Sequence, residues 1–231
     1  MKVVILQPSY IPWRGYFHQI ALADIFVFYD DVKYDKNGWR NRNRIKAPGG
    51  SQWLTIPVLT AHLEQDQIPI NQIKIDSSRN WAKKHWNALV TSYHKAPFFQ
   101  EIAPLLEQAY DSKADLLSQF TIPLTIMLAR RLGIEKTQFL QSSSILGVTG
   151  KKTDRLISIL NHLGATEYLS GPSAKNYLEE EKFRSNGIQL KYMTYNYPEY
   201  PQLYPPYESN LSILDLMFMT GSDALKYIIS Q

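Results

Sequence analysis

The chain has 231 residues and a formal net charge of +4, from 25 Lys and Arg against 21 Asp and Glu. It contains no cysteine, which excludes disulfides, zinc–thiolate sites and cysteine nucleophiles. No apolar stretch has the length of a signal peptide or a transmembrane helix, so we expect a cytoplasmic protein that does not contact membranes. The 15 tyrosines suggest a polar groove beside the core.

The first third of the chain is predicted to be mainly strands. Short apolar runs indicate strands at residues 2–8 and 24–32, with helical spacing at 16–23 between them. Beyond a basic stretch, further strands are predicted at residues 53–59 and 70–76.

Residues 77–132 have helical spacing, after which strands and helices alternate. Strands are expected at 137–145 and 187–197, with a helix, a Gly-Ala turn and a strand at 151–171 between them, and a last helix, with a serine N-cap and a glycine stop, at 209–221. This pattern predicts one α/β domain over residues 1–231, Rossmann-like, with a mainly parallel sheet and a helical insertion at about 77–132.

Four cations occupy every second position in the stretch "WRNRNRIK": Arg40, Arg42, Arg44 and Lys46. In an extended conformation all four would project from one face, where they repel each other unless an anion lies opposite. A charged edge strand that resists aggregation is the alternative. Three arginines favour a phosphate or carboxylate ligand, because a guanidinium group binds such anions in a bidentate way.

Polar residues follow three predicted strands, at the edge where α/β sheets bind ligands. We expect the three loops to meet in one cleft. The substrate-binding candidates are Gln7, Tyr10, Trp13, Arg14 and Tyr16 in the first loop, Tyr34, Trp39 and the three arginines in the second, and Ser170, Ser173 and Lys175 in the third.

Three residues are candidates for acid–base chemistry. Asp30 and Asp31 end a strand, where paired carboxylates act as a base or bind Mg²⁺, although a turn cap is an equal alternative. His85 is the most suggestive histidine, with His18 as its rival, but a core histidine is the more common case.

Two further features have a structural and a functional interpretation. Gly15, at a predicted helix start, would let a ligand approach the backbone. The tyrosine-rich residues 192–212 indicate either a stacking wall or an extended tail strapped over the sheet.

Four motifs resemble the WbqC-like family of bacteria: "LQPSYIPWRGYF", "FVFYDDVKYDKNGWRNRNRIK", "WLTIPV" and "EYLSGPSAKNYL". The resemblance extends over residues 4–221. Members are similar to proteins encoded in O-antigen and other surface-polysaccharide clusters, and the resemblance implies a glycine-type transfer to an aminosugar. It supplies no catalytic residues.

The order of elements also resembles HIGH-type nucleotidylyl transferases. Here "WRGY", at residues 13–16, stands in place of their "HxGH", so that only Gly15 is shared and both histidines are absent. This departure argues against ATP chemistry but leaves a nucleotide pocket open.

The leading hypothesis is an enzyme that transfers an aminoacyl or similar acyl group to a nucleotide-linked aminosugar. Its cofactor would be ATP with Mg²⁺ or an activated acyl donor, and the modest net charge disfavours tRNA as the donor. The alternatives are a non-catalytic partner of a glycosyltransferase assembly, a nucleotidyl or ligase-type enzyme, and a nucleic-acid binder.

Overall fold

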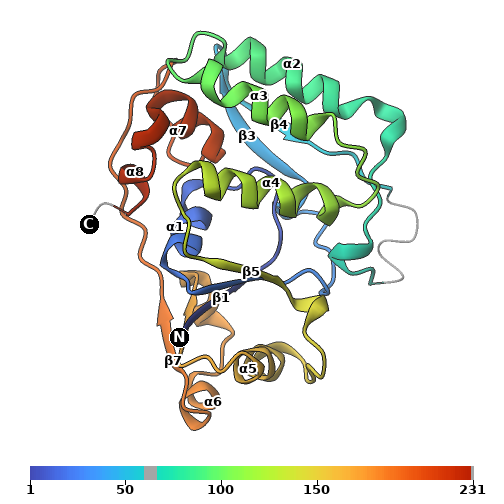
Figure 1. Cartoon of the computed structure of the whole chain (residues 1–231), viewed down its shortest axis with the longest axis vertical. Coiled ribbons are helices and arrows are strands. Elements are labelled where there is room, and N and C mark those ends of the chain that lie inside the picture. The colour runs from blue at the N-terminus through green and yellow to red at the C-terminus, as the bar shows by residue number, and fades with distance from the viewer. Residues whose placement is uncertain (60–66, 230–231) are drawn as a thin grey trace.

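The computed structural model describes residues 1–59 and 67–229 and contains a five-stranded sheet with helices on both faces (Figure 1). All five strands are parallel. They are β1 (Lys2–Leu6), β2 (Ile25–Phe28), β5 (Gln138–Gln141), β6 (Glu167–Ser170) and β7 (Gln189–Tyr192).

The strand order is β5-β2-β1-β6-β7. Counted along the chain this is 3-2-1-4-5, the order of a doubly wound Rossmann sheet, and the winding reverses between β1 and β6. The predicted Rossmann-like α/β fold with a mainly parallel sheet is therefore confirmed.

The central strands are apolar on both faces because helices cover both faces. In β1, Val4 packs into one core with α1 (Arg14–Leu22) and α4 (Leu117–Arg131). Val3 and Ile5 point the other way, into a core with α5 (Lys152–His162) and α6 (Glu180–Ser185). The side chains of this short β-branched strand thus contribute to both hydrophobic cores.

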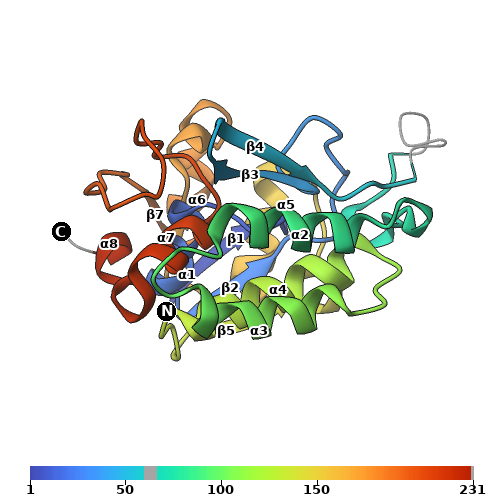
Figure 2. The same ribbon diagram turned by 90° about the horizontal axis from the view of Figure 1, so that it is seen from above.

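A long excursion separates β2 from β5. It begins with an antiparallel hairpin, β3 (Arg42–Ala47) and β4 (Gly50–Thr55), and continues with α2 (Trp81–Tyr93) and α3 (Phe99–Tyr110) before α4 returns to the sheet. Figure 2 shows the hairpin beside α2. The three long helices lie within the predicted helical region.

Two expected local features were wrong. Residues 70–76 form no strand but a 3-10 turn, Ile70–Gln72, followed by isolated bridges, because Ile70 and Ile73 turn into the core. Arg40 precedes β3, so the four alternating cations do not lie on one strand.

After β7 the chain runs along α1 toward the C-terminal helices. Residues 193–211 form neither helix nor strand, and α7 (Ile213–Thr220) and α8 (Lys226–Ile229) follow. Within the described ranges, no helix combines the length and apolarity needed to cross a membrane.

The start and end of α7 agree with the sequence. Ser212 Oγ accepts a hydrogen bond from the Leu214 amide, and Gly221 ends the helix at φ 54°. A Cβ on residue 221 would lie 2.4 Å from a ring carbon of Phe98.

We expect Gly221→Ala to lower the free energy of unfolding by about 2–4 kcal/mol, since it combines a strained backbone with a steric clash. Urea unfolding followed by circular dichroism measures the change. Gly49→Ala is the control, because a Cβ there meets nothing within 4 Å. Equal stability of the two variants would contradict the role of Gly221.

Candidate functional site

A cleft of about 600 Å³ opens where the winding of the sheet reverses, which is the usual ligand position in this fold. We call it the switch-point cleft. It is lined by Leu6, Gln7, Ser9, Pro12, Trp13, Tyr16, Gln19, Trp39, Arg40, Asn43, Arg44, Gly171, Pro172, Ser173, Tyr195 and Asn210. Its volume suits a small organic ligand.

The cleft brings together many of the predicted substrate-binding residues. Gln7, Trp13, Tyr16, Trp39, Arg40, Arg44 and Ser173 line it. The first and third predicted loops therefore meet, and the second contributes through Trp39 and Arg40. Tyr10, Arg14, Tyr34, Arg42, Ser170 and Lys175 lie outside the lining, as do Asp30, Asp31 and His85.

Asn43 fastens the hairpin to the loop after β1. Its Nδ2 donates to the carbonyls of Tyr10 (3.2 Å) and Ile11 (2.8 Å), and its Oδ1 accepts from the Arg44 amide (2.8 Å). Ile11 has φ 36°, which is rare for a β-branched residue. Such strained backbone is common at functional sites, where the surrounding contacts hold it.

The two arginines of the cleft keep most of their donors free of protein partners. Arg40 Nη1 donates to the Gln7 carbonyl at 3.2 Å, and Arg44 Nη2 donates to the Asn210 carbonyl at 3.3 Å. The Nε of each is buried without a partner. Among the described residues, neither guanidinium group forms an ion pair with a carboxylate.

Burial around these arginines affects the neighbouring groups. It lowers the pKa of Arg40, and it raises the pKa of Tyr16, which the charge of Arg40 partly opposes. The Tyr16 hydroxyl donates to the Gln7 carbonyl. No carboxylate or imidazole occurs among the cleft-lining residues, so the cleft is electropositive.

Trp13 covers the start of α1. A Cβ on Gly15 would lie 2.3 Å from the indole of Trp13, so the glycine makes room for this ring and not for a ligand, contrary to expectation. The indole meets the ring of Tyr195 edge-on at 5.0 Å. One aromatic wall of the cleft is therefore formed by residues far apart in the sequence.

Arg14 points away from the cleft and binds the tyrosine-rich segment, residues 193–211. It is buried, with Nη1 donating to the Pro198 carbonyl (2.8 Å) and Nη2 to the Tyr207 hydroxyl (2.9 Å). Its guanidinium carbon lies 4.6 Å from the ring centroid of Tyr197. The segment is extended as predicted but lies along α1 rather than over the sheet, and Tyr195 lines the cleft; its role as a stacking wall for a ligand stays a prediction.

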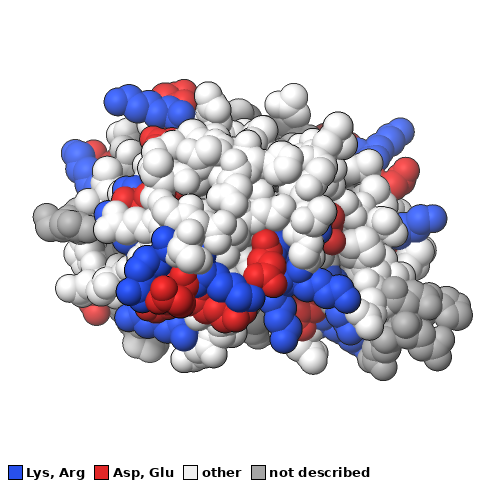
Figure 3. Space-filling view, turned by 90° about the horizontal axis from the view of Figure 1, so that it is seen from below, with Lys and Arg blue, Asp and Glu red and all other residues white. Residues whose placement is uncertain are grey.

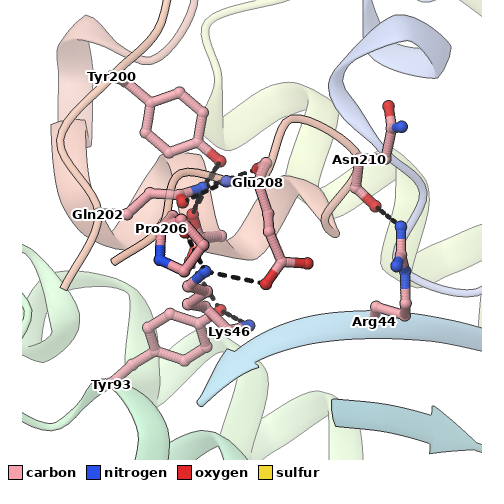
Figure 4. Close-up of polar contacts among 9 residues, drawn as sticks. Arg44, Lys46, Tyr93, Tyr200, Gln202, Pro206, Glu208 and Asn210 are labelled. Carbon is pink, nitrogen blue, oxygen red and sulfur yellow. Dashed lines mark hydrogen bonds and ion pairs between the residues drawn. The ribbon is translucent and has the colours of Figure 1, made fainter. Parts of the chain in front are cut away.

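A second buried cation fixes the far end of the same segment (Figure 4). Lys46 is fully buried, and its Nζ donates to the Pro206 carbonyl and to Glu208 Oε1 at 2.9 Å. Its backbone amide donates to the Tyr93 hydroxyl, which in turn donates to Asp215. Lys46 is thus neutralised, unlike Arg44 two residues earlier.

Asp30 is fully buried and joins β2 to the turn after β5. Its carboxylate accepts from the Ser143 amide (3.0 Å), Ser143 Oγ (2.7 Å) and Gln141 Nε2 (3.0 Å). Asp31 forms an ion pair with Arg155 and accepts from Ser142 Oγ. These contacts match the turn-capping alternative, and the proposed catalytic role would require them to open.

His85 also lies in a closed environment. Its Nδ1 is 2.9 Å from the hydroxyl of Tyr10, which also bonds the hydroxyl of Tyr110. Burial lowers the pKa of His85 to about 4, against a smaller opposing effect of the Thr55 backbone. Tyr34 and His85 line a second cavity, of about 480 Å³.

The remaining candidates lie beside the cleft. Ser170 is buried, and its carbonyl accepts from the Met193 amide. The Lys175 ammonium lies 5.1 Å from the ring centroid of Tyr192. Arg42 Nη2 donates to the Asn37 carbonyl. The rival histidine, His18, is buried with its Nδ1 2.9 Å from the Tyr197 hydroxyl.

The sequence interpretation missed five polar residues of the cleft: Ser9, Gln19, Asn43, Tyr195 and Asn210. Asn43 had a usable signal, because it alternates with the arginines and so must face the interior, where an amide needs partners. Tyr195 and Asn210 reach the cleft only through the path of residues 193–211, and Gln19 lines it from α1.

The sequence profile of the WbqC-like protein family matches residues 7–227, a range that includes every cleft-lining residue except Leu6. The chain belongs to the WbqC-like protein family. The predicted resemblance is confirmed.

This WbqC-like protein is 41% identical over 229 residues to the uncharacterized protein Rv1507c of Mycobacterium tuberculosis (strain ATCC 25618 / H37Rv). The match covers 98% of this chain and 97% of the mycobacterial protein. No solved structure matches the chain.

We expect Asp30→Ala to lower the free energy of unfolding by about 2–4 kcal/mol, because it leaves several buried donors without an acceptor. Thermal unfolding measures the loss. Asp223→Ala, which removes an exposed ion pair with Lys226, is the control and should cost at most about 1 kcal/mol. Unchanged stability with abolished turnover would instead support the catalytic role of Asp30.

We expect acid to destabilise the protein through His85. Its pKa in the folded state, about 4, lies below the ordinary value of 6.5, so protons bind the unfolded state more tightly. Stability is therefore lost as the pH falls from about 6.5 to 4, by roughly 3 kcal/mol in total. Urea unfolding at successive pH values measures the slope.

His85→Gln should flatten this pH dependence, whereas His162→Gln, at an exposed position, should leave it as in the wild type. The role of His85 is contradicted if both variants follow the wild-type curve.

Proposed function

We propose that this WbqC-like protein is an enzyme of surface-polysaccharide precursor biosynthesis. It binds a nucleotide-linked aminosugar in the switch-point cleft and transfers an aminoacyl or other acyl group to the sugar amine. The observation that carries the proposal is the pair Arg40 and Arg44, which line the cleft and form no ion pair with a carboxylate in the described part of the chain.

The arginines suit a diphosphate. Placing guanidinium groups in a partly desolvated cleft costs free energy unless an anion compensates the charge. A diphosphate offers oxygens that match the guanidinium donors in bidentate geometry. Such charge-assisted hydrogen bonds contribute about 1.5–3 kcal/mol each.

The rest of the lining suits a sugar. Side-chain amides and a hydroxyl line the same cleft, namely those of Gln7, Ser9, Gln19, Asn43 and Asn210. Gln19 is buried, its Nε2 donates to the Tyr195 hydroxyl, and its Oε1 has no partner in the described part of the chain. A buried amide oxygen without a partner favours a ligand that brings a hydroxyl or amine donor.

In the reaction, the lone pair of the amine attacks the carbonyl carbon of an activated acyl donor. The new C–N bond forms, the bond to the leaving group breaks with its electron pair on the leaving group, and the proton that the amine loses passes to the leaving group, directly or through water. Guanidinium donors of Arg40 and Arg44 that the diphosphate leaves unused would stabilise the oxyanion of the tetrahedral intermediate.

Several activated acyl compounds would serve as the donor in this reaction, including an acyl group activated by ATP with Mg²⁺ and an aminoacyl-tRNA. The nucleotidyl or ligase-type alternative differs only in requiring the protein to activate the acyl group itself.

Two other classes have less support. A non-catalytic partner would have no reason to line a cleft with two arginines that form no ion pair in the described part of the chain. A nucleic-acid binder needs a broad basic face. In Figure 3, positive and negative side chains alternate in one band, consistent with ion pairs such as Lys182–Asp154 between α6 and α5.

We expect Arg44→Ala and Arg40→Ala each to weaken binding of a UDP-linked aminosugar by about 1.5–3 kcal/mol, roughly ten- to a hundredfold or more. The cause is the loss of charge-assisted bonds to the diphosphate. Isothermal titration calorimetry measures the affinities.

Arg184→Ala is the matched control, since it removes an exposed arginine of α6 from an ion pair with Glu181. Mass spectrometry of the sugar product, after incubation with aminoacyl thioesters or aminoacyl-tRNA, tests the transfer. Wild-type protein that binds no nucleotide-linked sugar, or arginine variants that bind as well as Arg184→Ala, would refute the proposal.

A further inference from the structure

Two large aromatic side chains lie exposed at the mouth of the switch-point cleft. Trp39 is 44% exposed and Trp53, on β4, is 46% exposed. Their ring centroids are 5.2 Å apart, with the planes inclined at 32°. We call this pair the tryptophan platform. Two adjacent indoles in water are costly unless they have a partner, because each carries a large apolar surface.

Cations from the facing strand flank the platform. Arg44 pairs with Trp53 across the hairpin, and its guanidinium carbon lies 5.8 Å from the indole centroid. The guanidinium carbon of Arg42 lies 5.0 Å from the same centroid. Arg42 therefore lies beside the tryptophan platform, although it does not line the cleft.

The platform is continuous with the cleft through two residues. Trp39 belongs to the platform and lines the cleft, and Arg44 lines the cleft and contacts Trp53. A ligand held at its diphosphate by Arg44 therefore has indole rings on the side toward solvent. Toward the interior it has the amides of Gln19 and Asn43.

We infer that the tryptophan platform binds the nucleobase of the substrate, so that the base lies at the mouth, the diphosphate at Arg40 and Arg44, and the sugar inside. This inference rests on the proposed function and adds to it the orientation of the ligand in the cleft. It also makes Trp53, which is outside the cleft, a binding residue.

The choice of a base for the platform follows from the chemistry of the two ends of the ligand. A nucleobase is planar and aromatic, and it stacks on an indole whatever its hydrogen-bonding pattern. A sugar carries many hydroxyls, which need both donors and acceptors; the amides inside the cleft supply both, whereas each indole of the platform supplies a single N–H donor and no acceptor. The flanking guanidinium groups also stack on bases.

The test measures binding of four probes by calorimetry: UDP, GDP, ADP and inorganic pyrophosphate. Trp53→Ala should weaken the tightest-bound nucleoside diphosphate by about tenfold or more, while pyrophosphate binds as in the wild type. Trp53→Phe keeps a ring and should restore most of the affinity. Tyr177→Ala, which removes a 69% exposed ring outside the cleft, is the control.

The outcomes separate this inference from the proposed function. If Trp53→Ala and Trp53→Phe bind the nucleoside diphosphates like the wild type, the platform does not hold the base, and the diphosphate site stands. If the wild type binds pyrophosphate as tightly as any nucleoside diphosphate, the inference fails in the same way. If it binds none of the four, the proposed function itself fails.

A fifth probe, a single-stranded RNA oligomer, tests the other natural occupant of a stacking surface. Tighter binding of this oligomer than of any nucleoside diphosphate, lost in Trp53→Ala and steeply weakened by salt, would overturn the inference in favour of nucleic acid.

Discussion

The side chain of Asn43 is the contact on which the architecture of the cleft depends. Its amide nitrogen donates hydrogen bonds to the carbonyls of Tyr10 and Ile11, which belong to the loop after β1. Its amide oxygen accepts a hydrogen bond from the backbone amide of Arg44 in β3. One buried residue thus ties the inserted hairpin to the Rossmann sheet and keeps Ile11 in a backbone conformation that it would otherwise avoid. Because side chains alternate along a strand, fixing Asn43 toward the interior also fixes Arg44 on the opposite face of β3.

The part of the cleft that residues 193–211 form depends on two buried cations, Arg14 and Lys46. Arg14 binds the Pro198 carbonyl and the Tyr207 hydroxyl, and Lys46 binds the Pro206 carbonyl and the carboxylate of Glu208, so both cations hold residues 193–211 in place. This segment has no helix or strand to fix its path, so its position follows from these polar contacts and from ring packing against Trp13. Tyr195 and Asn210 reach the cleft as a consequence. A segment without regular structure thus contributes side chains to the lining of the cleft.

The sheet could be predicted because its determinants are local. The runs around Val3 and Phe26 are apolar, short and separated by helical spacing, and parallel strands bring their loops to one edge. Side-chain direction was harder to predict. Arg14 and Arg40 have the same chemistry and both follow a strand, but Arg14 lies on the buried face of α1, under a segment that arrives from more than 180 residues later. Asp30 lies two residues beyond the end of β2, and its partners come from the end of β5 and the turn that follows, a long-range pairing with no signal in the sequence.

The cations of the alternating basic stretch therefore lie in two different electrostatic environments. At Lys46 the protein supplies an anion and a carbonyl, so the charge is satisfied and the residue can be fully buried. At Arg44, two residues earlier on the same face, the Asn210 carbonyl accepts from Nη2, and the Nε has no partner among the described residues. Against the opposing effect of burial, Lys46 and the charge of Arg44 lower the pKa of Glu208, but the carboxylate forms its ion pair with Lys46. Arg44 and Arg40 thus line the cleft, at the point where Rossmann sheets bind ligands, without an ion pair in the described part of the chain. An anionic ligand would complete there what Glu208 completes at Lys46.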